Sequence, residues 1–203
     1  MIVILHERIL IMLRRLIILL IYFVGALNTV SAQKLGVKTN LLYDMAILTP
    51  NIGLETALGQ QSTLNFSANY NPWMLNGADK DNKKLVHWII EPEFRYWLNQ
   101  KFNSHFLGLH ILGGKYNISE YDIPQLFEKE YRYEGWTLGS GISYGYHWKW
   151  DQYWRMEFNL GIGFAYLEYD KYGCEKCAEK EGRFSKKYFG PTKTGISLIY
   201  IIK

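Results

Sequence analysis

The chain has 203 residues and a formal net charge of +4, with 23 Lys and Arg against 19 Asp and Glu. This length fits one domain, and a near-neutral charge without a clustered basic face gives no support for nucleic-acid binding. Tyr and Trp are abundant, with 16 and 7 copies, as expected of a protein that places aromatic rings at both interfaces of a membrane.

The N-terminal segment has the layout of a secretory signal peptide. Two arginines precede an apolar stretch at 16–27, and a Val-Ser-Ala segment with the character of a cleavage site follows it. The apolar stretch is shorter than the ~20 residues that a membrane-spanning helix needs, which disfavours a transmembrane anchor. We expect a signal peptide at 1–32, a mature domain at 33–203, and translation from Met12.

Apolar and polar side chains alternate with a period of two along the mature chain, which is the pattern of β-strands. The clearest example runs from Trp154 to Tyr166, where large apolar residues alternate with Arg155, Glu157, Asn159 and small residues. An aromatic residue stands at each end of the apolar face. This arrangement is typical of a strand in a transmembrane β-barrel.

The alternation predicts eight strands, at 34–43, 50–58, 63–71, 86–98, 105–116, 133–147, 153–169 and 192–202. Connections two, four and six are short, connections three, five and seven are long, and the first is a short exception. Bacterial outer-membrane barrels have short periplasmic turns and long extracellular loops. We therefore predict an all-β fold, an eight-stranded antiparallel up-and-down transmembrane barrel in the bacterial outer membrane, with its loops extracellular.

A soluble lipocalin-like barrel, with its apolar face turned inward, shows the same alternation. Its outer face would be rich in Lys, Glu and Thr. The polar face here is instead mostly Asn, Ser and Gly, as in Asn65, Ser67, Asn69, Gly139, Gly141, Gly161 and Gly163. Aromatic residues at the ends of the apolar face also have no purpose in a soluble barrel, so the membrane barrel is favoured.

The last predicted strand has a polar–Gly–apolar–aromatic spacing, carried by Lys193, Gly195, Leu198 and Tyr200. We interpret this spacing as a signal for insertion into the outer membrane. The expected partners are therefore outer-membrane lipid and the barrel assembly machinery.

Seven ionisable residues share the polar face of these strands: Glu55, Glu91, Glu93, Arg95, His110, Arg155 and Glu157. Charges enclosed by strands must be paired to offset their desolvation. We interpret them as a salt-bridge network that fills a barrel too narrow for a channel. A catalytic Glu–His pair is the alternative, but no fixed spacing supports it. His87, His105 and His147 are predicted at strand ends, without metal-ligand spacing.

Cys174 and Cys177 lie in the longest predicted outer loop, at 170–191. An even pair of cysteines in an exported chain is normally oxidised, so we predict a disulfide that stiffens this loop. A structural zinc site needs four ligands, and a thioredoxin-type site needs a helix N-terminus. Metal and redox roles remain the alternatives, and we expect no metal and no cofactor.

Seven ordered motifs resemble those of the domain-of-unknown-function family 3575: GVKTNLLYD at 36–44, TPNIGLE at 49–55, NYNPW at 69–73, PEFRYW at 92–97, YEGW at 133–136, SYGY at 143–146 and GPTKTGISLIY at 190–200. The resemblance covers essentially all of the mature chain. It implies a small outer-membrane barrel of Gram-negative bacteria, often encoded beside genes for fimbrial subunits. The Cys-x-x-Cys pair before the last strand also fits the family pattern. The family has no established activity or catalytic residues.

We therefore expect a structural or adhesive surface protein with an accessory role in fimbrial assembly, and with fimbrial or surface proteins as partners. The sequence contains no catalytic signature. One alternative is an outer-membrane lipid-modifying enzyme of the deacylase or acyltransferase type, which would need a Ser–His pair near the outer leaflet. His87 is the only histidine near an outer end of a predicted strand. A narrow pore is the other alternative.

Overall fold

The computed structural model describes residues 34–73, 83–173 and 179–202. The expected signal peptide at 1–32 and the expected disulfide between Cys174 and Cys177 lie outside the described residues.

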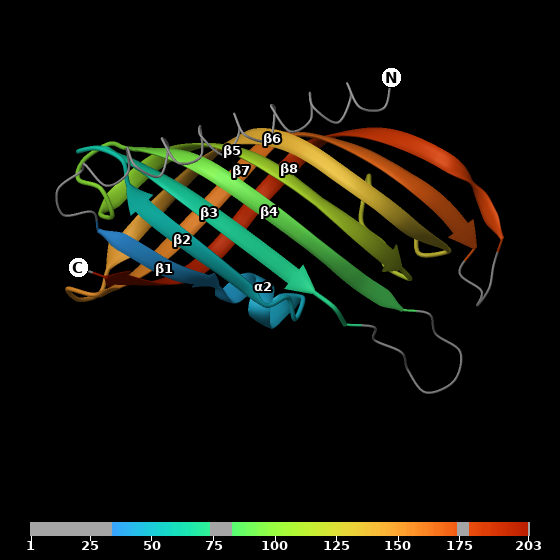
Figure 1. The fold of residues 1–203 in the computed structure, drawn as a ribbon, viewed down its shortest axis with the longest axis horizontal. Coiled ribbons are helices and arrows are strands. Elements are labelled where there is room, and N and C mark those ends of the chain that lie inside the picture. The colour runs from blue at the N-terminus through green and yellow to red at the C-terminus, as the bar shows by residue number, and fades with distance from the viewer. Residues whose placement is uncertain (1–33, 74–82, 174–178, 203) are drawn as a thin grey trace, which may run out of the picture. The chain divides into compact units, whose positions relative to one another are not determined.

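Eight antiparallel strands form a closed barrel in chain order, with β8 paired to β1 (Figure 1). The strands are β1 (Leu35–Asn40), β2 (Asn51–Ala57), β3 (Ser62–Asn71), β4 (Lys84–Trp97), β5 (Ser104–Ser119), β6 (Tyr131–Lys149), β7 (Trp154–Gly173) and β8 (Lys180–Ile202), and a short helix, α2 (Leu41–Ala46), follows β1. The predicted eight-stranded up-and-down β fold is thus confirmed. No helix in the described ranges has the length and apolar character needed to cross a membrane.

The first strand is shorter than predicted, because its last three expected residues belong to α2. The Asn40 side chain caps this helix and accepts a hydrogen bond from the Leu42 N–H at 3.1 Å. Asp44 in the helix accepts hydrogen bonds from Thr39 at 2.7 Å and from Asn51 at 2.9 Å. Such local side-chain bonds give the backbone an alternative to the strand.

The last strand is longer than predicted, and much of the expected loop at 170–191 is strand. β7 continues to Gly173, and its C-terminal part pairs with the first half of β8. This end of the barrel, opposite the short turns, is called the upper end below. There the Asp170 carboxylate forms ion pairs with Arg183 at 3.0 Å and with Lys180 at 2.7 Å. Charged side chains in this extension interrupt the apolar alternation on which the prediction depended.

The barrel is uneven in height. β1 pairs with β8 only between Leu35–Asn40 and the last residues of β8, from Ile202 to Ser197. Within the described ranges, the part of β8 that precedes Ser197 in the chain pairs with β7 alone. Strands β4 to β8 consequently extend well past β1 and β2, as Figure 1 shows.

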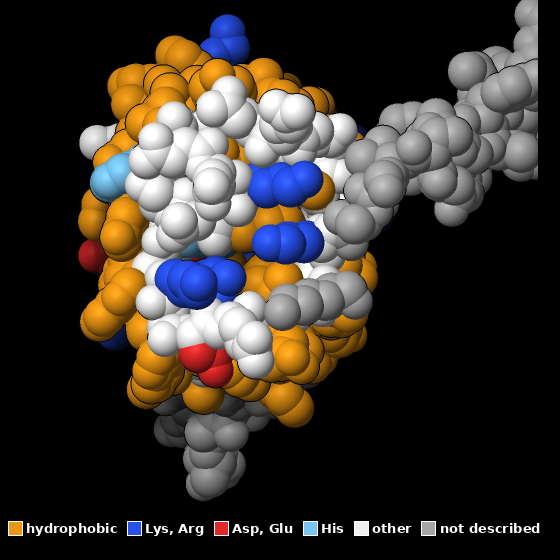
Figure 2. Space-filling view, turned by 90° about the vertical axis from the view of Figure 1, so that its left-hand side faces the viewer, with side chains coloured by type: hydrophobic (Ala, Val, Ile, Leu, Met, Phe, Trp, Pro, Cys, Tyr) orange, Lys and Arg blue, Asp and Glu red, His pale blue; other side chains and the backbone are white. Residues whose placement is uncertain are grey.

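Apolar side chains cover the outside of the barrel, and polar side chains fill the middle of its interior. The exposed residues on β7 include Trp154, Phe158, Leu160, Ile162, Phe164 and Tyr166, whereas Glu157 and Asn159 between them are buried. Figure 2 views the end that carries the short turns, where Lys and Arg side chains lie near the centre and hydrophobic side chains surround them. In this middle part the polarity of the barrel is therefore the reverse of that of a water-soluble protein.

Candidate functional site

The turn end of the barrel is closed by aromatic side chains. Phe102, in the connection between β4 and β5, is 2% exposed and packs with Ala57, Ile199 and Ile201. Its ring centroid lies 6.1 Å from that of Trp97. Phe102 has a φ of 58°, a left-handed conformation that bulky residues rarely adopt. The ring is therefore held in the barrel at the cost of local backbone strain.

Above this aromatic layer, Arg95 lies at the centre of a buried charge cluster. Its guanidinium donates to Glu93 at 2.6 Å and to Glu55 and Glu157 at 2.7 Å. A second nitrogen donates to the other oxygen of Glu157 at 3.0 Å, which completes a bidentate pair. All four side chains are essentially inaccessible to solvent, so each charge depends on the others for compensation.

Two lysines extend the cluster toward the upper barrel. The Lys38 ammonium lies 3.1 Å from Glu157 and 3.8 Å from Glu55. The Lys193 ammonium contacts Glu91 and lies 3.1 Å from Glu93. Cations and carboxylates from β1, β2, β4, β7 and β8 thus form one continuous layer across the interior.

The structure brings together five of the seven interior residues singled out in the sequence: Glu55, Glu91, Glu93, Arg95 and Glu157. His110 faces the interior but contacts Thr192, with 2.9 Å between Nε2 and Oγ1. Arg155 does not join the cluster, because its guanidinium donates to the backbone carbonyls of Phe102, Asp151 and Trp154.

Sequence reasoning missed Lys38, Lys193 and His147. His147 does lie near the end of β6, which continues to Lys149, but its side chain is buried inside the barrel rather than at an interface or in a turn. Its Nε2 lies 2.7 Å from Glu157. A signal was present in the sequence, since His147 and Lys193 share parity with the small residues Gly145 and Gly195.

Glu55, His147 and Glu157 place three possible metal-ligand atoms within 4.8 Å of one another. Both carboxylates already contact Arg95 and Lys38. These side chains supply the positive charge that a metal ion would supply, so the donor set fits a salt-bridge network better than a metal centre.

A β-bulge in β8 determines what lies above the charged layer. The register passes from Gly161 opposite Lys193 to Ile162 opposite Pro191, which leaves Thr192 as the extra residue. Thr192 and Lys193 therefore both reach interior partners, His110 and Glu93 respectively. A bulge is the ordinary way for a strand to point two successive side chains in one direction.

The upper interior is apolar. Its buried residues are Tyr116, Ile118, Phe127, Tyr133 and Leu167. Phe127 belongs to the connection between β5 and β6, and its ring centroid lies 5.2 Å from that of Tyr116 and 4.9 Å from that of Tyr133. The connection thus folds back over the barrel, and the interior consists of an apolar upper compartment above a charged layer.

Comparison with known proteins gives a family without an assigned activity. The family model described as protein of unknown function, DUF3575, matches residues 17–202. No curated protein matches the chain, and no solved structure does. Because the match spans the whole barrel, the chain belongs to the DUF3575 family.

Proposed function

We propose that the protein is an integral β-barrel of the Gram-negative outer membrane with a structural or adhesive role at the cell surface. The reversed polarity of the barrel is the observation that carries this proposal. Leu160 is 59% exposed and Ile142 is 65% exposed on the outside, while Arg95 and Glu55 are fully buried inside. A hydrocarbon environment makes this arrangement favourable, whereas water would penalise it.

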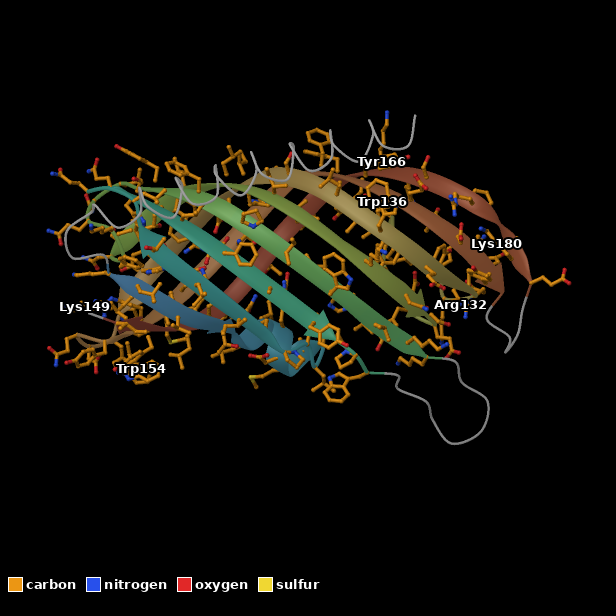
Figure 3. The ribbon with its side chains drawn as sticks, viewed as in Figure 1. Arg132, Trp136, Lys149, Trp154, Tyr166 and Lys180 are labelled. Atoms are coloured by element: carbon orange, nitrogen blue, oxygen red, sulfur yellow. The ribbon has the colours of Figure 1, made fainter. Side chains whose placement is uncertain are left out.

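The exposed apolar surface has the height of a bilayer. Tyr166 follows Trp154 by twelve positions along β7, and Trp148 follows Trp136 by twelve positions along β6. At about 3.3 Å per residue and a tilt of about 40°, this span rises roughly 30 Å. Figure 3 places Trp154 toward one end of the barrel and Trp136 and Tyr166 toward the other. The aromatic residues therefore have the positions expected of two interfacial girdles.

The filled interior favours a structural role over the narrow pore. Phe102 closes the turn end, and the charged layer around Arg95 closes the middle. The space beside Lys38 and Lys193 is about 40 Å³, room for no more than a few water molecules.

The lipid-modifying enzyme receives no support from the position of His87. Its Nδ1 lies 2.9 Å from the backbone carbonyl oxygen of Leu85. Two histidines contact hydroxyl groups within the described ranges: the Nδ1 of His105 lies 2.6 Å from the Tyr144 hydroxyl, and His110 has Thr192 as its partner. Neither hydroxyl belongs to a serine, and the Nδ1 of His110 has no hydrogen-bond partner within these ranges. A catalytic base normally has such a second partner to orient it.

Membrane fractionation of cells expressing the full chain tests the location. We expect recovery in the outer membrane, and a shift in gel mobility between unheated and boiled samples, because a closed barrel satisfies its backbone internally and resists detergent. Recovery in the soluble periplasm would contradict the proposal.

The accessory role in fimbrial assembly rests on the family resemblance, and a deletion strain tests it. Loss of the protein should lower the number of surface fimbriae, and expression of the wild-type chain should restore it. Unchanged fimbriae in a strain that lacks the protein would remove this part of the proposal and leave the location standing.

A further inference from the structure

A cavity of about 240 Å³ lies in the upper barrel, above the charged layer. Its walls are mostly apolar and include Ile89 of β4, Leu112 of β5, Ala165 and Leu167 of β7, Tyr188 of β8, and Phe127 of the β5–β6 connection. The chemistry of these walls therefore selects hydrocarbon over a polar solute.

The cavity also contains polar atoms at defined positions. Tyr116 lines it, is 7% exposed, and has a hydroxyl without a hydrogen-bond partner within the described ranges. Buried hydroxyls are normally satisfied, and one that is not points to a missing partner. Thr192, which lies 2.9 Å from His110, is a second polar group in the wall. A ligand with an apolar chain and one polar end would satisfy both features.

The cavity borders the exposed apolar surface along β8. Tyr188 and Pro191 line it, and they lie above Ser197, where the β1–β8 ladder stops. Phe189, between them, is 55% exposed and packs against Phe164 on the outer face, with 4.6 Å between ring centroids. The apolar outer surface therefore lies next to the wall of the cavity, along a strand edge that has no ladder partner in the described ranges.

We propose that this cavity binds a fatty acyl chain that passes over the free edge of β8 near Pro191 and directs its polar end toward Tyr116 and Thr192. The volume lies below the usual 300–1,000 Å³ of pockets for drug-sized ligands, so the cavity holds a segment of the chain. The chain belongs either to a free fatty acid or to a membrane lipid. Binding rests on the cavity alone, and only the membrane-lipid source rests on the proposed location.

Photo-crosslinking tests the proposal with the full-length mature barrel in phospholipid nanodiscs. One arm adds palmitate with a mid-chain diazirine, and the other uses a phosphatidylcholine whose acyl chain carries the same group. Mass spectrometry then locates the crosslinks along β5, where Leu112 and Tyr116 face the interior and Leu109 and Ile111 face outward. We expect labelling at Leu112 and Tyr116 that excess unlabelled palmitate suppresses at least tenfold.

Two substitutions supply a matched pair. Ala165→Phe fills the cavity and should reduce interior labelling at least tenfold without changing labelling at Ile111. Leu138→Phe enlarges an exposed residue of β6 and should leave interior labelling unchanged. The heat-dependent gel shift reports whether each variant folds. If Ala165→Phe fails to fold, the competition with unlabelled palmitate in the wild-type protein decides whether the cavity binds an acyl chain.

The outcomes separate this proposal from the proposed location. Labelling of Leu109 and Ile111 by the phospholipid, without interior labelling in either arm, would overturn the acyl-chain site and support the membrane barrel. Interior labelling by palmitate alone identifies a free fatty acid as the source, whereas interior labelling in both arms identifies membrane lipid. Interior labelling by palmitate without any phospholipid labelling of the outer face would keep the site and count against the location.

Discussion

Arg95 compensates three buried carboxylates at once, and this concentration makes it the most sensitive interior position. Arg95→Met should lower the free energy of unfolding by about 3–5 kcal/mol, because Glu55, Glu93 and Glu157 lose their central partner while they stay buried. Urea unfolding of the detergent-solubilised barrel measures the change. The control is Arg183→Met, which removes an exposed ion pair with Asp170 and should change the free energy of unfolding far less, because solvent screens exposed pairs. Equal losses at both positions would contradict the buried network.

Asp151 provides a prediction on pH in the turn between β6 and β7. Its carboxylate accepts hydrogen bonds from the N–H groups of Trp154 at 2.7 Å and Tyr153 at 2.6 Å. These bonds favour the charged form and hold the pKa of Asp151 below its ordinary value of 3.8. Because the pKa is depressed in the folded state, the contribution of the carboxylate to the turn is complete above the ordinary pKa, and is lost as the pH falls through the folded pKa.

A carbon-13 NMR titration of the Asp151 carboxyl group measures this pKa, with Asp151→Asn identifying the signal. We expect a midpoint below 3.8. A midpoint at or above the ordinary value would show that the two turn hydrogen bonds are not maintained in solution.

At the scale of the strand, β7 shows how strongly the two faces differ. Leu160 lies midway between Trp154 and Tyr166 and is exposed. If the apolar outer surface is embedded in a bilayer, Leu160→Arg should lower the free energy of unfolding by about 2–4 kcal/mol. Unfolding in lipid vesicles measures this. Ser185→Arg, at an exposed position of β8 beyond the apolar outer surface, is the control and should be nearly neutral. Equal tolerance of the two arginines would point to a barrel surrounded by water.

The strands could be predicted where one face is consistently apolar and the other small or polar, as along the lower part of β7. The sequence did not predict α2, because its start depends on Asn40 and Asn51, which meet only when β1 and β2 pair. The upper part of β8 was missed because charges such as Lys180 and Arg183 occupy it. Strict alternation also cannot anticipate a bulge, so the inward position of Thr192 beside Lys193 required the structure.

For the whole molecule, the closed interior leads to a prediction about ion flow. Reconstituted in planar bilayers, the barrel should show no steady conductance steps, because the aromatic layer at Phe102 and the charged layer at Arg95 close the path in series. Phe102→Ala should remain silent, since it removes one of the two layers. Regular steps from the wild-type protein would restore the pore as an interpretation.

The short first strand makes the contact between β1 and β8 the seam of the barrel. β1 has six residue pairs in register with β8 and four with β2, fewer in each case than the ladder between β7 and β8. Lys38 on β1 reaches past β8 to Glu157 on β7, with 3.1 Å between their charged groups. The charged layer therefore holds β1 to β7 across the seam and also fills the interior. Removal of the ion pair between Lys38 and Glu157 should accelerate hydrogen exchange in β1 before any other strand, so that the barrel opens from its N-terminal edge.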